Sequence, residues 1–205
     1  MITWIGITPD TVMINGERLT GAVTGSALLT ELYRKKVNDY PKFFKMDTLC
    51  RLGFVASELL LRHESGGFGR FVPREDRAVI LFNRSGSLET DKRFLATIRN
   101  TEDYFPSPAV FVYTLPNIVT GEIAIRNRYY GETSFFVLPE MEPRVMAFHI
   151  KNAFQDTVTA SVIGGWLECE SEEKFKALLF IAGEECREEA YMSGKIELFD
   201  KQLNS

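Results

Sequence analysis

The sequence has few of the side chains that bind metals or form disulfides. It contains 3 Cys and 2 His in 205 residues, and Cys50, Cys169 and Cys186 lie far apart along the chain. An odd number of widely separated cysteines gives no disulfide framework, and no Cys/His spacing fits a zinc site. We therefore expect no metal and no other cofactor.

The sequence also lacks a long apolar run and an excess of positive charge. No apolar run approaches ~18 residues, the length that crosses a bilayer, and the first residues show no basic region followed by an apolar one, as a signal peptide would. The formal net charge of -4 gives no attraction to nucleic acid or to an anionic membrane. We expect a cytoplasmic protein with no membrane span and no nucleic-acid partner.

What the sequence does have is the composition of a globular protein, with many phenylalanines. Hydrophobic residues make up 45% and charged residues 25% of the chain, which is enough material for one core. The 16 Phe indicate a bulky aromatic interior or interface. Because no repeat, linker or low-complexity segment interrupts the chain, we expect a single domain over residues 1–205, with a variable tail over residues 185–205.

Apolar runs alternate with segments of helical periodicity. The run RAVILF at 77–82 is continuously apolar, as in a strand covered on both faces, whereas residues 43–63 repeat apolar side chains every three or four positions. The alternation predicts an α/β fold with a mixed, mostly parallel five-stranded sheet and helices on both faces. The expected strands are 2–7, 77–82, 133–138, 157–168 and 174–182, a further short strand could form at 11–15, and the expected helices are 27–36, 43–63, 88–99, 115–129 and 143–155.

The segment SPAVFVYTLPNIVTGEIAIRNRYYGETSFFVLPE, residues 107–140, resembles the β-ketoacyl synthases of the thiolase superfamily. The matching positions are Ser107-Pro108, Pro116-Asn117, Gly121, Ile123 to Arg126, and Gly131. Three other segments agree with the family pattern: Lys45-Met46-Asp47, the loop NRSGSLE from Asn83 to Glu89, and Val162 to Gly165 followed by Glu168. The resemblance covers roughly residues 47–168. It implies a thiolase-like half-domain, the N-terminal half of a fold built from two similar halves.

Two departures from the family pattern bear on catalysis. The family's catalytic Cys lies nine residues beyond the glycine, and here Glu140 occupies that nucleophile position. A carboxylate is a poor substitute for a thiolate, because its acyl adduct is a mixed anhydride that hydrolyses easily. The family's two catalytic histidines lie in a second half-domain, and neither His63 nor His149 matches a family motif. We therefore expect no catalytic residue, with His63 as a helix C-terminal cation and His149 as a packing or surface residue.

Glu140 leaves two interpretations open. It could be a general acid/base or a charge that imitates a bound malonyl carboxylate, stabilised as the anion by the helix N-terminus. Alternatively, it merely caps the helix that begins near Pro143. Within the preceding helix, we expect Asn117 and Arg126 to cap and anchor the helix, and Gly121 to allow close helix packing.

The resemblance also implies an obligate partner. A lone half-domain would expose apolar side chains of its middle helix, residues 141–155, and apolar surface of that size usually marks an interaction site. By resemblance, the strand Thr133–Leu138 lies at the sheet edge, where it could pair with a twin strand in a homodimer. The alternative is a heterodimer with a full-length ketosynthase, and an acyl carrier protein is a further candidate partner. The middle helix would expose Val145, Met146, Phe148 and Phe154.

Three functions follow from these observations. The first is a non-catalytic β-ketoacyl-ACP-synthase-like subunit of a fatty-acid or polyketide type pathway, which resembles a 3-oxoacyl-ACP synthase but is inactive alone. The second is an acyl-processing enzyme, an acyltransferase or decarboxylase, that uses Glu140 or residues of its partner. The third is a binding domain whose likeness to the synthases extends only to the fold.

Overall fold

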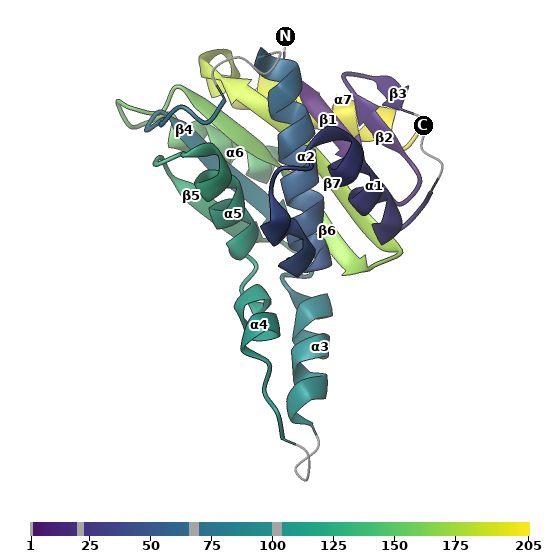
Figure 1. Ribbon diagram of the computed structural model, residues 1–205. Helices are drawn as coiled ribbons and strands as arrows, with labels where there is room; N and C mark the ends of the chain where they lie inside the picture. The colour runs from purple at the N-terminus through teal and green to yellow at the C-terminus, as the bar shows by residue number, and fades with distance from the viewer. Residues whose placement is uncertain (1, 20–22, 66–69, 100–103) are drawn as a thin grey trace.

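A computed structural model describes residues 2–19, 23–65, 70–99 and 104–205. These residues build a seven-stranded sheet with the strand order β3-β2-β1-β7-β6-β4-β5 (Figure 1). The strands are β1 (Trp4–Ile7), β2 (Val12–Ile14), β3 (Glu17–Leu19), β4 (Arg77–Asn83), β5 (Thr133–Val137), β6 (Ser161–Ser171) and β7 (Lys174–Gly183).

The sheet corrects the expectation of five mostly parallel strands. Only β4 runs parallel to its neighbours, β5 and β6, and the remaining neighbours pair antiparallel. The difference arises at residues 2–19, which fold as a meander of three strands. Asn15 and Gly16 take φ values of 52° and 89° in the tight turn between β2 and β3, as hairpin turns require. All three residues of β3 are exposed, so no apolar pattern marks this strand in the sequence.

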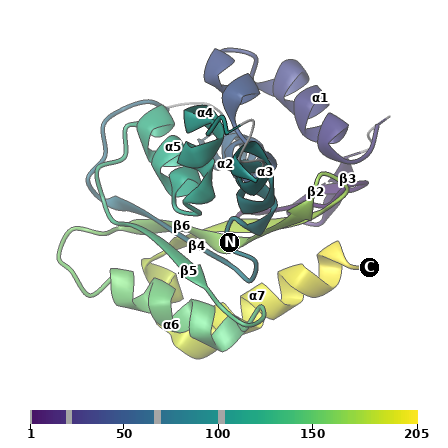
Figure 2. The ribbon, with the colours of Figure 1, turned by 90° about the horizontal axis from the view of Figure 1, so that it is seen from below.

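Helices cover both faces of the sheet, as expected (Figure 2). The helices α1 (Ser26–Lys36), α2 (Thr48–Ser65) and α5 (Ile118–Asn127) lie on one face, and α6 (Pro143–Ala153) and α7 (Glu189–Leu203) lie on the other. The helices α3 (Leu88–Ile98) and α4 (Pro108–Phe111) project beyond the sheet (Figure 1). Short 3-10 turns occupy Pro41–Lys45, Val112–Thr114 and Glu184–Arg187.

No single described helix is long and apolar enough to cross a bilayer. The segments Pro108–Thr114 and Ile118–Asn127 together reach the length and composition of a span, but they are bent by 96° at their junction.

The core forms two layers that β4 separates. All seven residues of β4 are buried, which confirms that the run RAVILF is covered on both faces. Val79 and Leu81 belong to the layer under α1, α2 and α5, whereas Ile80 and Phe82 belong to the layer under α6 and α7. Alternate side chains of one strand thus join the two halves of the core.

Most of the tail, residues 185–205, folds as the 15-residue helix α7. Its inward side chains are buried, and the ring of Phe199 stacks on Trp4 with centroids 5.0 Å apart. Because α7 lies beside α6 on the same face (Figure 2), Met146 and Phe154 of the middle helix are buried rather than exposed. Of the four apolar side chains that were expected to be exposed, only Phe148 is classed as exposed, with 47% of its surface accessible, and Val145 is half-buried. The buried stripe of α7 consists of Met192, Ile196, Phe199 and Leu203.

The helices α2 and α5 approach each other at Gly53. A Cβ atom at Gly53 would lie 2.4 Å from Cγ2 of Val119 and 2.8 Å from Cδ2 of Leu167. Gly121 was expected to allow this packing, and that prediction was wrong. A Cβ atom there would meet no heavy atom of the described residues within 4 Å, because Gly121 lies on the open side of α5.

Replacing the two glycines by alanine should therefore have opposite effects. We expect Gly53→Ala to lower the free energy of unfolding by about 1–2 kcal/mol, since overpacking outweighs the gain in helix propensity. Gly121→Ala should instead raise it by about 0.5–1 kcal/mol, because only the propensity changes. Urea unfolding measures both values, and equal shifts for the two variants would contradict the assignment of the close contact to Gly53.

Candidate functional site

The candidate site is the corner between β5 and α6. The strand ends at Val137 and the helix begins at Pro143, so Glu140 lies in the bend between them. Glu140 is exposed and makes no hydrogen bond or ion pair with the part of the chain that the structure describes. The N-cap residue of α6 is Glu142, whose side chain makes no capping hydrogen bond. The interpretation of Glu140 as the helix cap was therefore wrong, and its carboxylate is open to solvent.

A buried acid supports the loop beside this corner. Glu168 of β6 is 9% exposed, and its carboxylate accepts hydrogen bonds from the backbone N–H groups of Arg84 and Ser85 at 2.8 and 3.3 Å. The hydroxyl of Ser85 donates to the same carboxylate. A carboxylate that accepts several hydrogen bonds from one backbone segment holds that segment in place. Glu168 thereby holds the loop that follows β4 at the end of the sheet.

Asn83 closes the loop and ties it to the corner. Its side-chain amide donates to the carbonyl of Gly86 at 2.8 Å and accepts from the N–H of Gly86 at 3.0 Å. Its own carbonyl accepts from the N–H of Leu138, which follows β5, at 2.8 Å. The loop NRSGSLE, Glu168 and the corner are thus brought together, although they lie far apart in the sequence.

A small cavity adjoins this region at the start of α2. Asp47 precedes the first residue of α2, and its carboxylate accepts from the N–H of Cys50 at 2.8 Å and from the hydroxyl of Thr90 at 2.6 Å. Burial raises the pKa of Tyr113 to about 12, with a smaller contribution from the charge of Glu122, so the phenol stays neutral near pH 7. The cavity has a volume of about 90 Å³ and is lined by Lys45, Met46, Asp47, Thr90, Arg93, Ala109, Val110 and Tyr113.

The cysteine thiols are poor nucleophiles in this structure. Burial raises the pKa of Cys50 well above its usual range and that of Cys169 to about 12, and Cys186 is buried as well. A thiol attacks as the thiolate, so neither Cys50 nor Cys169 is a ready nucleophile near neutral pH.

The two histidines take the places that the sequence predicted. His63 lies in the last turn of α2 and is exposed. His149 of α6 stacks on Phe136 of β5 with ring centroids 4.1 Å apart, so its role is packing. No group of three or more metal-ligating side chains is gathered anywhere in the described parts of the chain.

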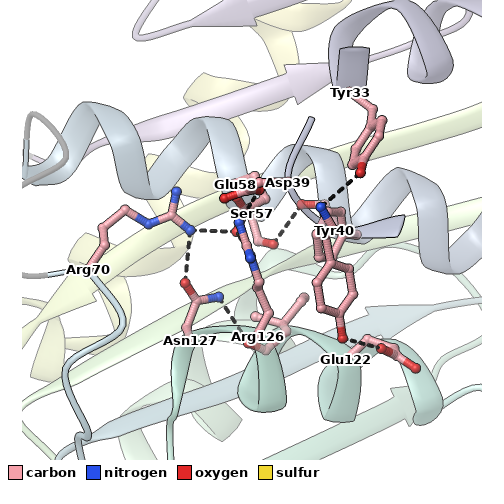
Figure 3. Close-up of polar contacts among 11 residues, drawn as sticks. Tyr33, Asp39, Tyr40, Ser57, Glu58, Arg70, Glu122, Arg126 and Asn127 are labelled. Carbon is pink, nitrogen blue, oxygen red and sulfur yellow. Dashed lines mark hydrogen bonds and ion pairs between the residues drawn. The ribbon is translucent and has the colours of Figure 1, made fainter. Parts of the chain in front are cut away.

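A buried charge network joins α2 to α5 (Figure 3). These helices lie on the opposite face of the sheet from α6 (Figure 2). Glu58 of α2 is fully buried. Its Oε1 atom accepts a hydrogen bond from Nη2 of Arg70 at 2.5 Å and lies 3.5 Å from Nε of Arg126. Arg70 also donates to the side chain of Asn127 at 2.9 Å. The second carboxylate oxygen of Glu58 has no hydrogen-bond partner among the described residues. Glu58 thus lies between two nearly buried guanidinium groups, those of Arg70 and Arg126.

Arg126 anchors α5, as expected. Its guanidinium lies 5.2 Å from the ring centroid of Tyr40 and 4.5 Å from that of Phe71, and it forms an ion pair with Asp39. Asn117 is the N-cap residue of α5, as expected, although its side chain makes no capping hydrogen bond. The Asn117 carbonyl instead accepts the hydroxyl of Thr120.

Sequence reasoning missed the acids of this network. A weak signal was present for Glu58, which is the one charged residue in the run FVASELLL, because an acid within an apolar helix needs a buried partner. Glu122 of α5 is also buried and pairs with Lys42 at 2.5 Å. Neither pairing could be read from the sequence, since each partner comes from a separate segment.

No protein-family model and no curated protein matches the chain. Among solved structures, the ishigamide ketosynthase/chain length factor is 16% identical, with a TM-score of 0.66 over 92% of this chain and 63% of that one. The chain has a ketosynthase-like fold. It spans less than two thirds of the length of that structure.

A second structure shows the same ketosynthase-like fold. The ketosynthase (ApeO) in complex with its chain length factor (ApeC) from Xenorhabdus doucetiae is 15% identical, with a TM-score of 0.56 over 89% of this chain and 78% of that one. At such identities the likeness shows the fold alone. Within this ketosynthase-like fold, β5 is an edge strand and Glu140 follows it at the strand-to-helix corner.

Proposed function

We propose that this ketosynthase-like chain is a non-catalytic subunit of a fatty-acid or polyketide type pathway and acts by pairing with a ketosynthase. The observation that carries the proposal is the corner after β5, which presents the exposed carboxylate of Glu140. By the resemblance in sequence, Glu140 takes the position of the synthases' catalytic cysteine. Covalent acyl transfer requires a nucleophile that accepts the acyl group and then releases it. In support, both similar structures are named for ketosynthases with chain length factors.

The edge strand β5 supplies a surface for pairing. It pairs with β4 on one side and with no other described strand on the second side. Val137 is 56% exposed, and Thr133 is exposed as well. An open edge of this kind offers unpaired backbone groups to a second strand, and an antiparallel strand from a ketosynthase would satisfy them. A homodimer through the same strand is the competing arrangement, and an acyl carrier protein would serve the assembled pair.

Co-expression with a complete ketosynthase from the same source tests the proposal. We expect a heterodimer in size-exclusion chromatography with light scattering, and we expect Thr133→Lys/Val137→Lys to weaken it at least tenfold, because lysines on an edge strand oppose pairing. Leu198→Lys, at an exposed position of α7, is the matched control and should leave the complex intact.

Two outcomes would contradict this function. Separate elution of the two proteins would remove the proposed partner. Acyl turnover by this chain that disappears in Glu140→Gln would favour the second function, an acyl-processing enzyme that uses Glu140.

A further inference from the structure

The helices α3 and α4 form an arm that projects from the end of the sheet (Figure 1). We define the arm as residues 88–99 and 104–115. Its two sides are joined at the base, where the hydroxyl of Ser87 donates to the carbonyl of Thr114, and further out, where the rings of Phe94 and Phe111 lie 5.3 Å apart. The arm is therefore a preformed unit rather than two separate helices.

The arm carries much apolar surface that nothing in the described chain covers. In α3, an 11-residue helix, Thr90 alone is buried, and Phe105 on the returning segment is 81% exposed. Helices of this length are marginal in water without packing, and contiguous exposed apolar surface usually marks an interaction site. The exposed large hydrophobic residues of the arm are Leu88, Leu95, Tyr104, Phe105, Phe111, Val112 and Leu115.

The base of the arm lies near the end of the edge strand β5. At the arm base, Leu88 is 48% exposed, and Val137 at the end of β5 is 56% exposed. Two residues before Leu88, a Cβ atom at Gly86 would be 4.0 Å from Cγ2 of Val137. Figure 1 shows α4 below α5 and β5 along one flank of the molecule. A protein that pairs with β5 would therefore lie next to the arm.

The edge strand alone is too small to hold a stable partner. It has five residues, whereas a specific interface needs about 800 Å² and roughly 20–30 residues on each side. We propose that the arm is the second part of the interface, and that its apolar side chains pack on the ketosynthase that pairs with β5. This inference rests on the proposed function. In this arrangement the arm contributes most of the contact area with the partner, and β5 sets the alignment of the partner's strand.

The test uses the full chain and the ketosynthase from the same source. Leu95→Lys/Phe105→Lys places charges at two exposed positions of the arm, and we expect at least a tenfold loss of affinity by isothermal titration calorimetry. The circular dichroism spectrum of the variant should match that of the unchanged protein, since neither side chain is buried. Leu198→Lys again serves as the control and should bind normally. Hydrogen exchange should slow at residues 104–115 when the ketosynthase is added.

The outcomes separate this inference from the proposed function. In one outcome, the unchanged chain binds the ketosynthase, the β5 variant does not, and the arm variant binds normally. If hydrogen exchange at residues 104–115 also fails to slow, the arm inference is overturned and the proposed function stands. If the unchanged chain binds no ketosynthase, the proposed function is wrong, and so is the assignment of a ketosynthase as the protein that covers the arm. If the arm variant abolishes self-association only, the occupant is a second copy of this chain and the ketosynthase assignment is overturned.

Discussion

Replacing Glu58 by glutamine should lower the free energy of unfolding by about 3–5 kcal/mol, which is the cost of leaving a buried charge without its partner. Glu58 is fully buried, and the side chains of Arg70 and Arg126 are 9% and 11% exposed. Glutamine keeps the shape of the side chain but removes the negative charge that both guanidinium groups face. Urea unfolding monitored by circular dichroism measures the change.

The matched control is Glu31→Gln. Glu31 pairs with Lys35 one turn away on α1, and an ion pair of this kind on a helix surface contributes about 0.3–0.5 kcal/mol. In a double-mutant cycle, Glu58→Gln and Arg70→Gln should be less than additive, because the second change removes a charge that the first leaves unpaired. A loss below about 1 kcal/mol for Glu58→Gln would show that water replaces the carboxylate, and that α2 and α5 do not depend on the network.

Replacing Phe199 by alanine should lower the free energy of unfolding by about 3–5 kcal/mol, the usual cost of removing a buried aromatic ring. Phe199 is 5% exposed, stacks on Trp4 and lies 6.4 Å from the ring of Phe180. The change would open a cavity between α7 and the sheet. Thermal or urea unfolding measures the loss.

The neighbouring residue provides the control for this prediction. Leu198 is 44% exposed, so Leu198→Ala should change the free energy of unfolding by about 0.5 kcal/mol or less. Similar small values for both variants would mean that α7 is only loosely attached. In that case the face beside α6 would be open, as the sequence had predicted.

The features that the sequence predicted well depend on local pattern. The run at 77–82 is apolar without interruption and so had to be a strand with two covered faces. The corner at Glu140 was placed by a strand pattern that stops just before a Pro-initiated helix, together with the family spacing from Gly131. The loop that follows β4 and Glu168 were placed by the same family pattern, and the hydrogen bonds of Glu168 explain why those two segments occur together.

The features that it missed depend on contacts between distant segments. The strand β3 has the sequence ERL and gains its structure only by pairing with β2. In α7, charged residues separate the buried ones, so its apolar stripe becomes meaningful only once a sheet face is available to it. The partners of Glu58 come from residues 70 and 126, and no periodicity relates those positions.

The position of β1 within the sheet has a consequence for how the chain folds. This strand lies between β2 and β7, and Trp4 is aligned with Phe180. During synthesis the first three strands must therefore wait, with one side of β1 unpaired, until residues 174–183 have left the ribosome. Pairing across such a long stretch of chain slows folding, because the loop must close before the contacts form. Until then, the unpaired side of β1 leaves the nascent chain open to misassembly, which is a task for chaperones.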